Sequence, residues 1–256
     1  WPQALAGGRA VLYTGSPTAD NFDDACLVVQ TLDGAAPRVL KCGGSFWTYV
    51  NSGHVLFAHA GTVFAAPFDL DQLAFTGEGV PVLEGVRSAI VSGVAQFTVS
   101  QDGLLAYISG EGTGSSATPI EVVDRQGKTT RLSGTPVNWG NLSFSPEGDR
   151  LAMDVSSPTG RTIWIHDLAR DAPQPVTFGI LDSVPIWTPN GLRITFTSVT
   201  RGAAGLFWVD ASGGTPERLT ESERQQIPGS WSPDGLSLAY TEIRNDAGDV
   251  MILPME

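Results

Sequence analysis

Lysine is nearly absent from this chain, and long apolar runs do not occur at all. Of the 15 basic residues only Lys41 and Lys128 are lysines, against 27 acidic residues, so the net charge is -12. Such a chain repels the phosphates of nucleic acids and of anionic lipids. No run approaches the roughly 18 apolar residues of a membrane-spanning helix, and Trp1-Pro2-Gln3 opens the chain without a basic segment followed by an apolar one. We therefore expect neither nucleic acid binding nor insertion of this chain into a membrane.

Side chains suited to metal or nucleophilic chemistry are also few. A metal site needs several ligands at suitable spacing, which His54, His59, His166, Cys26 and Cys42 do not offer. The acidic stretch 20–24 lacks the central glycine and the closing glutamate of an EF-hand loop. The Gly-x-Ser-x-Gly pattern of a hydrolase serine does not occur. The sequence thus predicts no metal, no cofactor and no catalytic residues.

Glycine and proline are abundant, with 30 and 17 residues, and they mark an internal repeat. An aromatic residue followed by Ser/Thr-Pro-acidic/Asn-Gly occurs at 144–148, 187–191 and 231–235, and weaker copies end at Gly8, Gly53 and Gly103. The six turn glycines are 45, 50, 45, 43 and 44 residues apart. Glycine suits these turns because it accepts positive φ. The spacing indicates a six-fold repeat.

Each repeat contains the pattern of short strands rather than of helices. After the turn comes a strand such as Leu151-Ala152-Met153, then one such as Ile163-Trp164-Ile165, and then one ending in a pair such as Val176-Thr177. No repeat has a ten-residue stretch with helical periodicity of its apolar residues. With the strand that enters the turn, four strands in about 45 residues predict a β-propeller blade.

We expect an all-β protein that forms one six-bladed β-propeller domain over residues 1–256. Its four-stranded antiparallel blades are predicted at 1–42, 43–90, 91–135, 136–180, 181–223 and 224–256. The last blade ends after its third strand, so either it has three strands or the chain is a piece of a longer propeller. The aromatic residues before the clearest turns are expected to pack between blades; they are Phe144, Trp187 and Trp231.

The turn Ser232-Pro233-Asp234-Gly235, followed by Leu238-Ala239-Tyr240, resembles the TolB-like, WD40-like (PD40) propeller repeats. The chain is also similar to the propeller that follows the transmembrane helix in many bacterial serine/threonine kinases. The similar segments, in order, are 1–3, 53–58, 67–69, 81–86, 96–97 and 123–127. The kinase motifs themselves are absent. This resemblance implies an extracytoplasmic module, periplasmic or at the cell surface, that is tethered through a segment outside these residues.

The two cysteines flank one predicted hairpin. Counting outward from the turn at 33–36 places Cys26 within a residue of Cys42, so a disulfide is geometrically allowed. Two free thiols, as in an intracellular protein, are the alternative.

Function is left open between different classes. A non-catalytic binding or sensor propeller, or a protein-interaction scaffold, fits the repeat and the lack of catalytic patterns. The alternatives are the accessory propeller of a prolyl oligopeptidase-like serine peptidase, and a propeller hydrolase such as a lactonase or glycosidase. Fold alone does not choose among them.

The binding surface is predicted at the end of the propeller that carries the long loops, 16–24 and 109–118. The opposite end has tight turns and is expected to offer little concavity. A protein or small-molecule ligand at the long-loop mouth would meet residues at the starts of innermost strands, although the tryptophans among them could instead pack between blades. These residues are Phe46, Trp47, Asn138, Trp139, Asp182 and Gln226.

Overall fold

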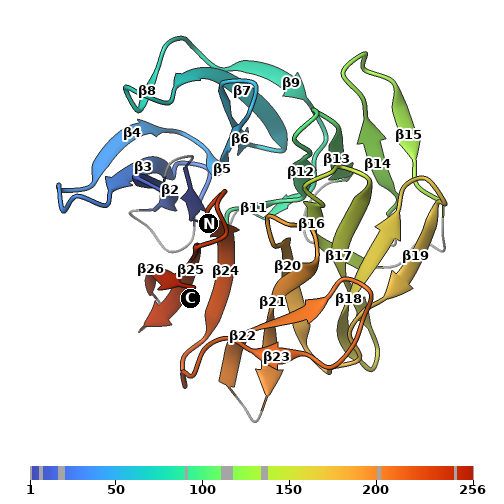
Figure 1. Ribbon diagram of the computed structural model, residues 1–256. Helices are drawn as coiled ribbons and strands as arrows, with labels where there is room; N and C mark the ends of the chain where they lie inside the picture. The colour runs from blue at the N-terminus through green and yellow to red at the C-terminus, as the bar shows by residue number, and fades with distance from the viewer. Residues whose placement is uncertain are drawn as a thin grey trace. The chain divides into compact units, whose positions relative to one another are not determined.

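A computed structural model describes residues 2–5, 8–16, 21–89, 92–110, 118–133, 138–200, 203–244 and 247–255, without the side chains of 200 and 203 (Figure 1). Its described residues form strands and turns, with no helix long and apolar enough to cross a membrane. The chain divides into two compact units, Trp1–Gln96 with Ser109–Gly114, and Phe97–Ile108 with Ser115–Glu256. One domain over residues 1–256 stays a prediction.

The first unit contains two blades and a small hairpin. Blade 1 is the antiparallel sheet β1-β2-β3-β4, and in blade 2 the strands β5, β6, β7 and β9 pair in that order while β8 pairs with the end of β7. The hairpin is β10-β11. The bounds are β1 Gln3–Ala4, β2 Ala10–Gly15, β3 Cys26–Thr31, β4 Arg38–Cys42, β5 Ser45–Val50, β6 His54–His59, β7 Thr62–Asp69, β8 Ala74–Phe75, β9 Val80–Leu83, β10 Ser88–Ala89 and β11 Val94–Ala95.

The second unit contains four blades. Blades 3, 4 and 5 are four-stranded antiparallel sheets, and blade 6 is the three-stranded sheet β24-β25-β26. The bounds are β12 Phe97–Val99, β13 Leu105–Ile108, β14 Ile120–Val123, β15 Thr129–Arg131, β16 Asn138–Phe144, β17 Arg150–Ser157, β18 Gly160–Asp167, β19 Ala172–Pro175, β20 Asp182–Trp187, β21 Arg193–Thr200, β22 Ala203–Asp210, β23 Glu217–Arg218, β24 Gln226–Trp231, β25 Ser237–Arg244 and β26 Ala247–Pro254.

The turn after the first strand of each blade has one construction. All six repeat glycines have φ between 62° and 90°, and each donates its backbone N–H to the carbonyl three residues earlier. In blade 6 the hydroxyl of Ser232 also donates to Asp234 and accepts from the N–H of Ser237. The side chains of Thr188 and Asn190 repeat this arrangement in blade 5. The prediction of positive-φ turn glycines is confirmed.

Aromatic residues lie between neighbouring blades of the second unit. Trp187 and Trp231 are 6% and 9% exposed, and Phe144 is also buried. The indole N–H of Trp187 donates to the Ser143 carbonyl of blade 4, and that of Trp231 donates to the Thr195 hydroxyl of blade 5. Each tryptophan therefore fills and ties a junction, as the sequence predicts.

Candidate functional site

The six predicted mouth residues lie in the first strands β5, β16, β20 and β24, beside irregular backbone. Each of these strands shifts register against its neighbour, between Ser45 and Thr48 in β5 and at corresponding places in the others. Phe46 has φ 53° and Val184 has φ 55°. Positive φ is strained for non-glycine residues, most of all for β-branched valine. Such strain clusters at functional sites, so these bulges are where a site is best sought.

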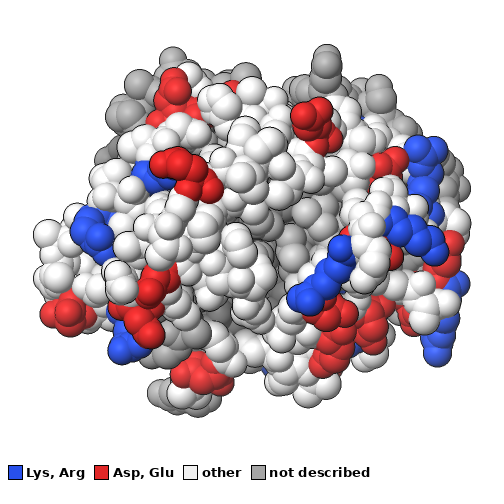
Figure 2. Space-filling view, turned by 90° about the horizontal axis from the view of Figure 1, so that it is seen from above, with Lys and Arg blue, Asp and Glu red and all other residues white. Residues whose placement is uncertain are grey.

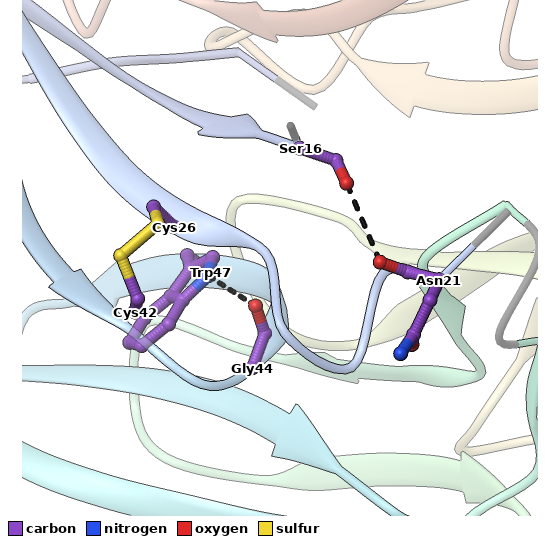
Figure 3. Close-up of a disulfide and its surroundings, with 6 residues drawn as sticks. All are labelled: Ser16, Asn21, Cys26, Cys42, Gly44 and Trp47. Carbon is purple, nitrogen blue, oxygen red and sulfur yellow. Dashed lines mark hydrogen bonds between the residues drawn. A yellow bond between two sulfur atoms is a disulfide. The ribbon is translucent and has the colours of Figure 1, made fainter. Parts of the chain in front are cut away.

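Trp47 packs inside the first unit. Its side chain is 2% exposed and stacks on Phe57 with ring centroids 4.3 Å apart. Its indole N–H donates to the Gly44 carbonyl at 2.8 Å, beside the Cys26–Cys42 disulfide (Figure 3). Burial leaves no surface for a ligand, which favours the blade-packing alternative for this residue.

The other predicted residues differ in accessibility. Phe46, Asn138 and Trp139 are partly buried, and Trp139 packs against the apolar core of blades 3 and 4. These three side chains retain surface that a ligand could reach. Their role as ligand contacts stays a prediction. In the two long loops, residues 17–20 and 111–117 lie outside the described residues.

Asp182 and Gln226 are 1% and 2% exposed, so they are not displayed at an open mouth. Asp182 accepts a hydrogen bond from Ser198 at 2.6 Å. The amide oxygen of Gln226 accepts from Thr220, and its amide nitrogen donates to Glu242 at 3.0 Å. Both side chains make internal contacts, and a role for them as ligand contacts stays a prediction.

Glu242 is the centre of an ion-pair cluster that the sequence did not reveal. Its carboxylate accepts hydrogen bonds from Gln226, Ser222, Arg224 and Arg244. The hydrogen bonds, Gln226 first and Arg244 next, lower the pKa of Glu242 to about 2. Its arginine partners are half-exposed, so the cluster presents two oriented guanidinium groups to solvent. The alternation of Glu242 with Arg244 along β25 was the only sequence signal.

Asp154 is the most deeply buried carboxyl group near the bulges. It is fully buried and accepts hydrogen bonds from Asn141 at 2.8 Å and from the N–H of Val184 at 3.1 Å. Its Oδ1 lies 3.7 Å from Nε of Arg161 and has no hydrogen-bond partner among the described residues. Burial raises the pKa of Asp154, opposed by these polar neighbours. We call Asn141, Asp154, Arg161 and Val184 the bulge site.

Gly140 makes room for this carboxylate, because a Cβ there would lie 2.0 Å from Oδ1 of Asp154. The repeat carries a sequence signal for this site, because blade 4 has an aspartate, Asp154, at the position where blades 5 and 6 have threonine. These threonines are Thr197 and Thr241. Among the described residues no group of three or more His, Cys, Asp or Glu side chains could hold a metal ion. Arg161, whose side chain is 43% exposed, gives the bulge site a polar group at the protein surface.

The tight-turn end of the first unit is hollowed, contrary to the sequence expectation. A cavity of about 480 Å³ lies there, lined in part by Arg9, Leu32, Asp33 and Leu73. Its lining comes from the glycine turn of blade 1, the turn after β3 and the turn after β7. The expectation that this end has little concavity was wrong for the first unit.

Charge is mixed on one face of the protein. On the face that Figure 2 shows, acidic and basic side chains of the described residues are interspersed with broad uncharged areas. Several arginines lie over aromatic rings, for example Arg150 over Trp187 and Arg193 over Trp208. The basic residues thus mostly serve contacts within the protein.

The family comparison decides the identity. The model of the TolB β-propeller domain (PD40) matches residues 66–256, which is more than half of the chain. The chain belongs to the TolB β-propeller domain family. The resemblance stated from the turn motif is confirmed at this level, and the match begins within β7 of blade 2.

Solved structures show the same fold. This TolB-like propeller is similar to TolB from Acinetobacter baumannii, with a TM-score of 0.72 and 15% identity over 96% of this chain and 61% of that one. It is also similar to a putative TolB from Agrobacterium tumefaciens, with a TM-score of 0.69 and 17% identity over 96% and 85% of the two chains. The predicted all-β six-bladed propeller, with mainly four-stranded antiparallel blades, is confirmed.

A curated relative matches a shorter stretch. The uncharacterized peptidase YuxL of Bacillus subtilis is 31% identical over 106 aligned residues, and the match covers 38% of this chain. The match spans 16% of the length of YuxL.

Proposed function

We propose that this TolB-like propeller is a non-catalytic binding module, a sensor or interaction scaffold, whose ligand meets the first strands of the blades. The observation that carries this proposal is the strained bulge at Val184, held by the buried carboxylate of Asp154. Strain of this kind persists only where surrounding contacts over-determine it, and it accompanies ligand clamps. Arg161 at the bulge site, and Arg224 and Arg244 beside Glu242, each have part of their side chain exposed, so we propose a ligand that carries an anionic group.

We also propose that the module works outside the cytoplasm, as part of a bacterial signalling protein. The Cys26–Cys42 disulfide supports this, since Cys42 is exposed and such bonds persist in oxidising compartments. The second support is the sequence resemblance to the propeller that follows the transmembrane helix in many bacterial serine/threonine kinases. The reading frame on both sides of residues 1–256 tests it: a membrane helix and a kinase upstream are expected, and a frame without a membrane anchor or an export signal contradicts it.

The ligand proposal is tested with the purified chain. A thermal-shift screen of small anionic molecules and short peptides should yield ligands, and their affinity is then measured for Trp139→Ala in β16. Trp164→Ala is the matched control, because Trp164 is a partly buried tryptophan on β18 of the same blade. We expect Trp139→Ala to weaken binding at least about tenfold, the effect of losing an aromatic anchor, while Trp164→Ala leaves it nearly unchanged. Equal affinities for both variants contradict a first-strand site.

The similarity to YuxL favours a second candidate, the accessory propeller of a serine peptidase. In that case the propeller admits substrates to a separate catalytic domain. A hydrolase segment with a nucleophilic serine in the same reading frame would support this candidate over the first.

A further inference from the structure

The cavity at the tight-turn end of the first unit has an apolar inner wall. Leu5 and Ala10 are buried in the core of blades 1 and 2, and Leu70 and Leu73 pack against that core. All four residues line the cavity of about 480 Å³. Sites for small molecules are concave, mostly apolar and roughly 300–1,000 Å³ in volume. The cavity therefore has the size and the lining to bury the apolar part of a small molecule.

Two charges of opposite sign lie at the rim of this cavity. Arg9 and Asp71 line it, and both residues are exposed. Among the described residues, neither of these charged groups has a partner in an ion pair or a side-chain hydrogen bond. Arginines elsewhere in the chain lie over aromatic rings or pair with carboxylates, as Arg150, Arg193 and Arg244 do. The rim thus offers a cation and an anion that a ligand can pair with.

A second carboxylate at the rim, Asp33, is held in place by its own turn. Its Oδ1 accepts hydrogen bonds from the Thr31 hydroxyl at 2.6 Å and from the N–H of Ala35 at 3.1 Å. These bonds, Thr31 first, lower the pKa of Asp33, so its carboxylate is charged at neutral pH. The N–H of Leu32 donates to the Arg9 carbonyl at 2.9 Å. The glycine turn of blade 1 and the turn after β3 are therefore fixed relative to each other.

The wall that blade 2 contributes is also fixed, and it is strained. Leu73 has φ 51°, which is unfavourable for a residue other than glycine. Its carbonyl accepts a hydrogen bond from Arg38 of β4 at 2.9 Å, which ties the wall to blade 1. In the same turn Oδ1 of Asp69 accepts from the N–H groups of Asp71 and Gln72. Strain of this kind clusters at ligand sites, and a preformed cavity lowers the cost of binding.

We propose that this cavity binds a small zwitterion with an apolar body, either an apolar amino acid or a short apolar peptide with free ends. The carboxylate of the ligand pairs with Arg9, its ammonium group pairs with Asp71 and Asp33, and its apolar body lies on the inner wall. An anion without an ammonium group would meet two carboxylates, and a cation without a carboxylate would leave Arg9 unpaired. The proposal is independent of the ligand site proposed at the first strands.

Three dipeptides test the proposal with the whole chain by isothermal titration calorimetry. Leu-Leu carries both charges, N-acetyl-Leu-Leu lacks the ammonium group, and Leu-Leu amide lacks the carboxylate. We expect Leu-Leu to bind at least about tenfold more tightly than either capped form, because each cap removes a charge-assisted hydrogen bond. L-leucine in the same assay separates the two sources: tighter binding of leucine assigns a free amino acid, and tighter binding of Leu-Leu assigns a peptide. No binding of either, or equal binding of a capped form, overturns the proposal.

Two variants locate the charges. Arg9→Gln removes the partner of the carboxylate, so we expect it to weaken Leu-Leu at least about tenfold and to leave Leu-Leu amide nearly unchanged. Asp71→Asn should weaken Leu-Leu by a smaller factor, because Asp33 remains, and should leave N-acetyl-Leu-Leu nearly unchanged. Arg125→Gln is the matched control, since Arg125 is an exposed arginine of the second unit. Equal losses for Leu-Leu and its capped forms overturn the proposal.

Nuclear magnetic resonance of the wild-type chain locates the ligand without a variant. Leu-Leu should shift the backbone amide signals of Leu32 and Leu73, which line the cavity from two different turns. Shifts confined to the first strands of the second unit would place the dipeptide at the other proposed site and overturn the proposal for the cavity alone.

Discussion

The carboxylate of Asp154 accepts the backbone N–H of Val184 at 3.1 Å and so joins the second strand of blade 4 to the bulge of blade 5. At the same place in the next blade, the hydroxyl of Thr197 donates to the backbone carbonyl of Gln226 at 2.9 Å. The two junctions thus use one position of the repeat with opposite hydrogen-bond polarity. A carboxylate accepts only, and it therefore selects a bulge that presents its N–H.

Gly140 and Asp154 should be energetically coupled. Gly140→Ala forces the carboxylate from its place, and we expect a loss of about 1–3 kcal/mol in the free energy of unfolding, as for an overpacked core. Asp154→Ala leaves Asn141 and the Val184 N–H without their acceptor, and it should cost about as much. In the Asp154→Ala background the cost of Gly140→Ala should fall markedly. Urea unfolding of the four proteins measures this cycle, and additive costs would show that the two residues do not interact.

Glu242 should contribute to stability in a pH-dependent way. Its folded pKa of about 2 lies below the value of about 4.3 for an unfolded chain. Its contribution is therefore fully present above the unfolded pKa and is lost as the pH falls toward the folded one. We expect Glu242→Gln to flatten the loss of stability between about pH 5 and 2. Unfolding titrations over this range check it with Glu84→Gln, an exposed side chain, as the control; equal curves for both variants would exclude a role for the cluster.

The two mouth tryptophans should differ in stability. Trp47→Ala removes a side chain that is 2% exposed, and we expect it to cost about 3–5 kcal/mol. Trp139→Ala should cost less, because Trp139 is only partly buried. Denaturant unfolding of both variants compares them, and a smaller cost for Trp47→Ala would contradict the packing described for it.

The Cys26–Cys42 disulfide spans 16 residues of sequence. Closing a loop of this length stabilises a fold by about 3 kcal/mol in the chain-entropy account. We expect the Cys26→Ser, Cys42→Ser double variant to lose about 2–4 kcal/mol. Thermal unfolding measures the loss, and mass spectrometry without reductant checks the bond. Titration of two free thiols in the protein purified from its native compartment would contradict the bond and its extracytoplasmic location.

The blades could be predicted from sequence because their determinants are local. Gly148, Gly191 and Gly235 need only their own turns, and the spacing between them counts the repeats. The bulge site could not be predicted in the same way. Asp154 and Val184, which share a hydrogen bond, are 30 residues apart in sequence, and Gly140 is needed only because a Cβ there would clash with the Asp154 carboxylate. Trp47 shows a further limit, since a tryptophan at the start of a first strand has the same sequence signature whether it is buried or displayed.

The turns of blades 1 and 2 keep the backbone bond of the clearer copies without their side-chain bonds. Gly8 donates to the Leu5 carbonyl at 3.1 Å, and Gly53 donates to that of Val50 at 3.0 Å, although neither turn contains the Ser-Pro-Asp sequence. The side-chain hydrogen bonds of Ser and Asp therefore add to the stability of the turn, and one blade can lose them without unfolding the next. Duplicated copies of such a unit can diverge independently, and the bond from the glycine is the feature that a search for remote members should retain.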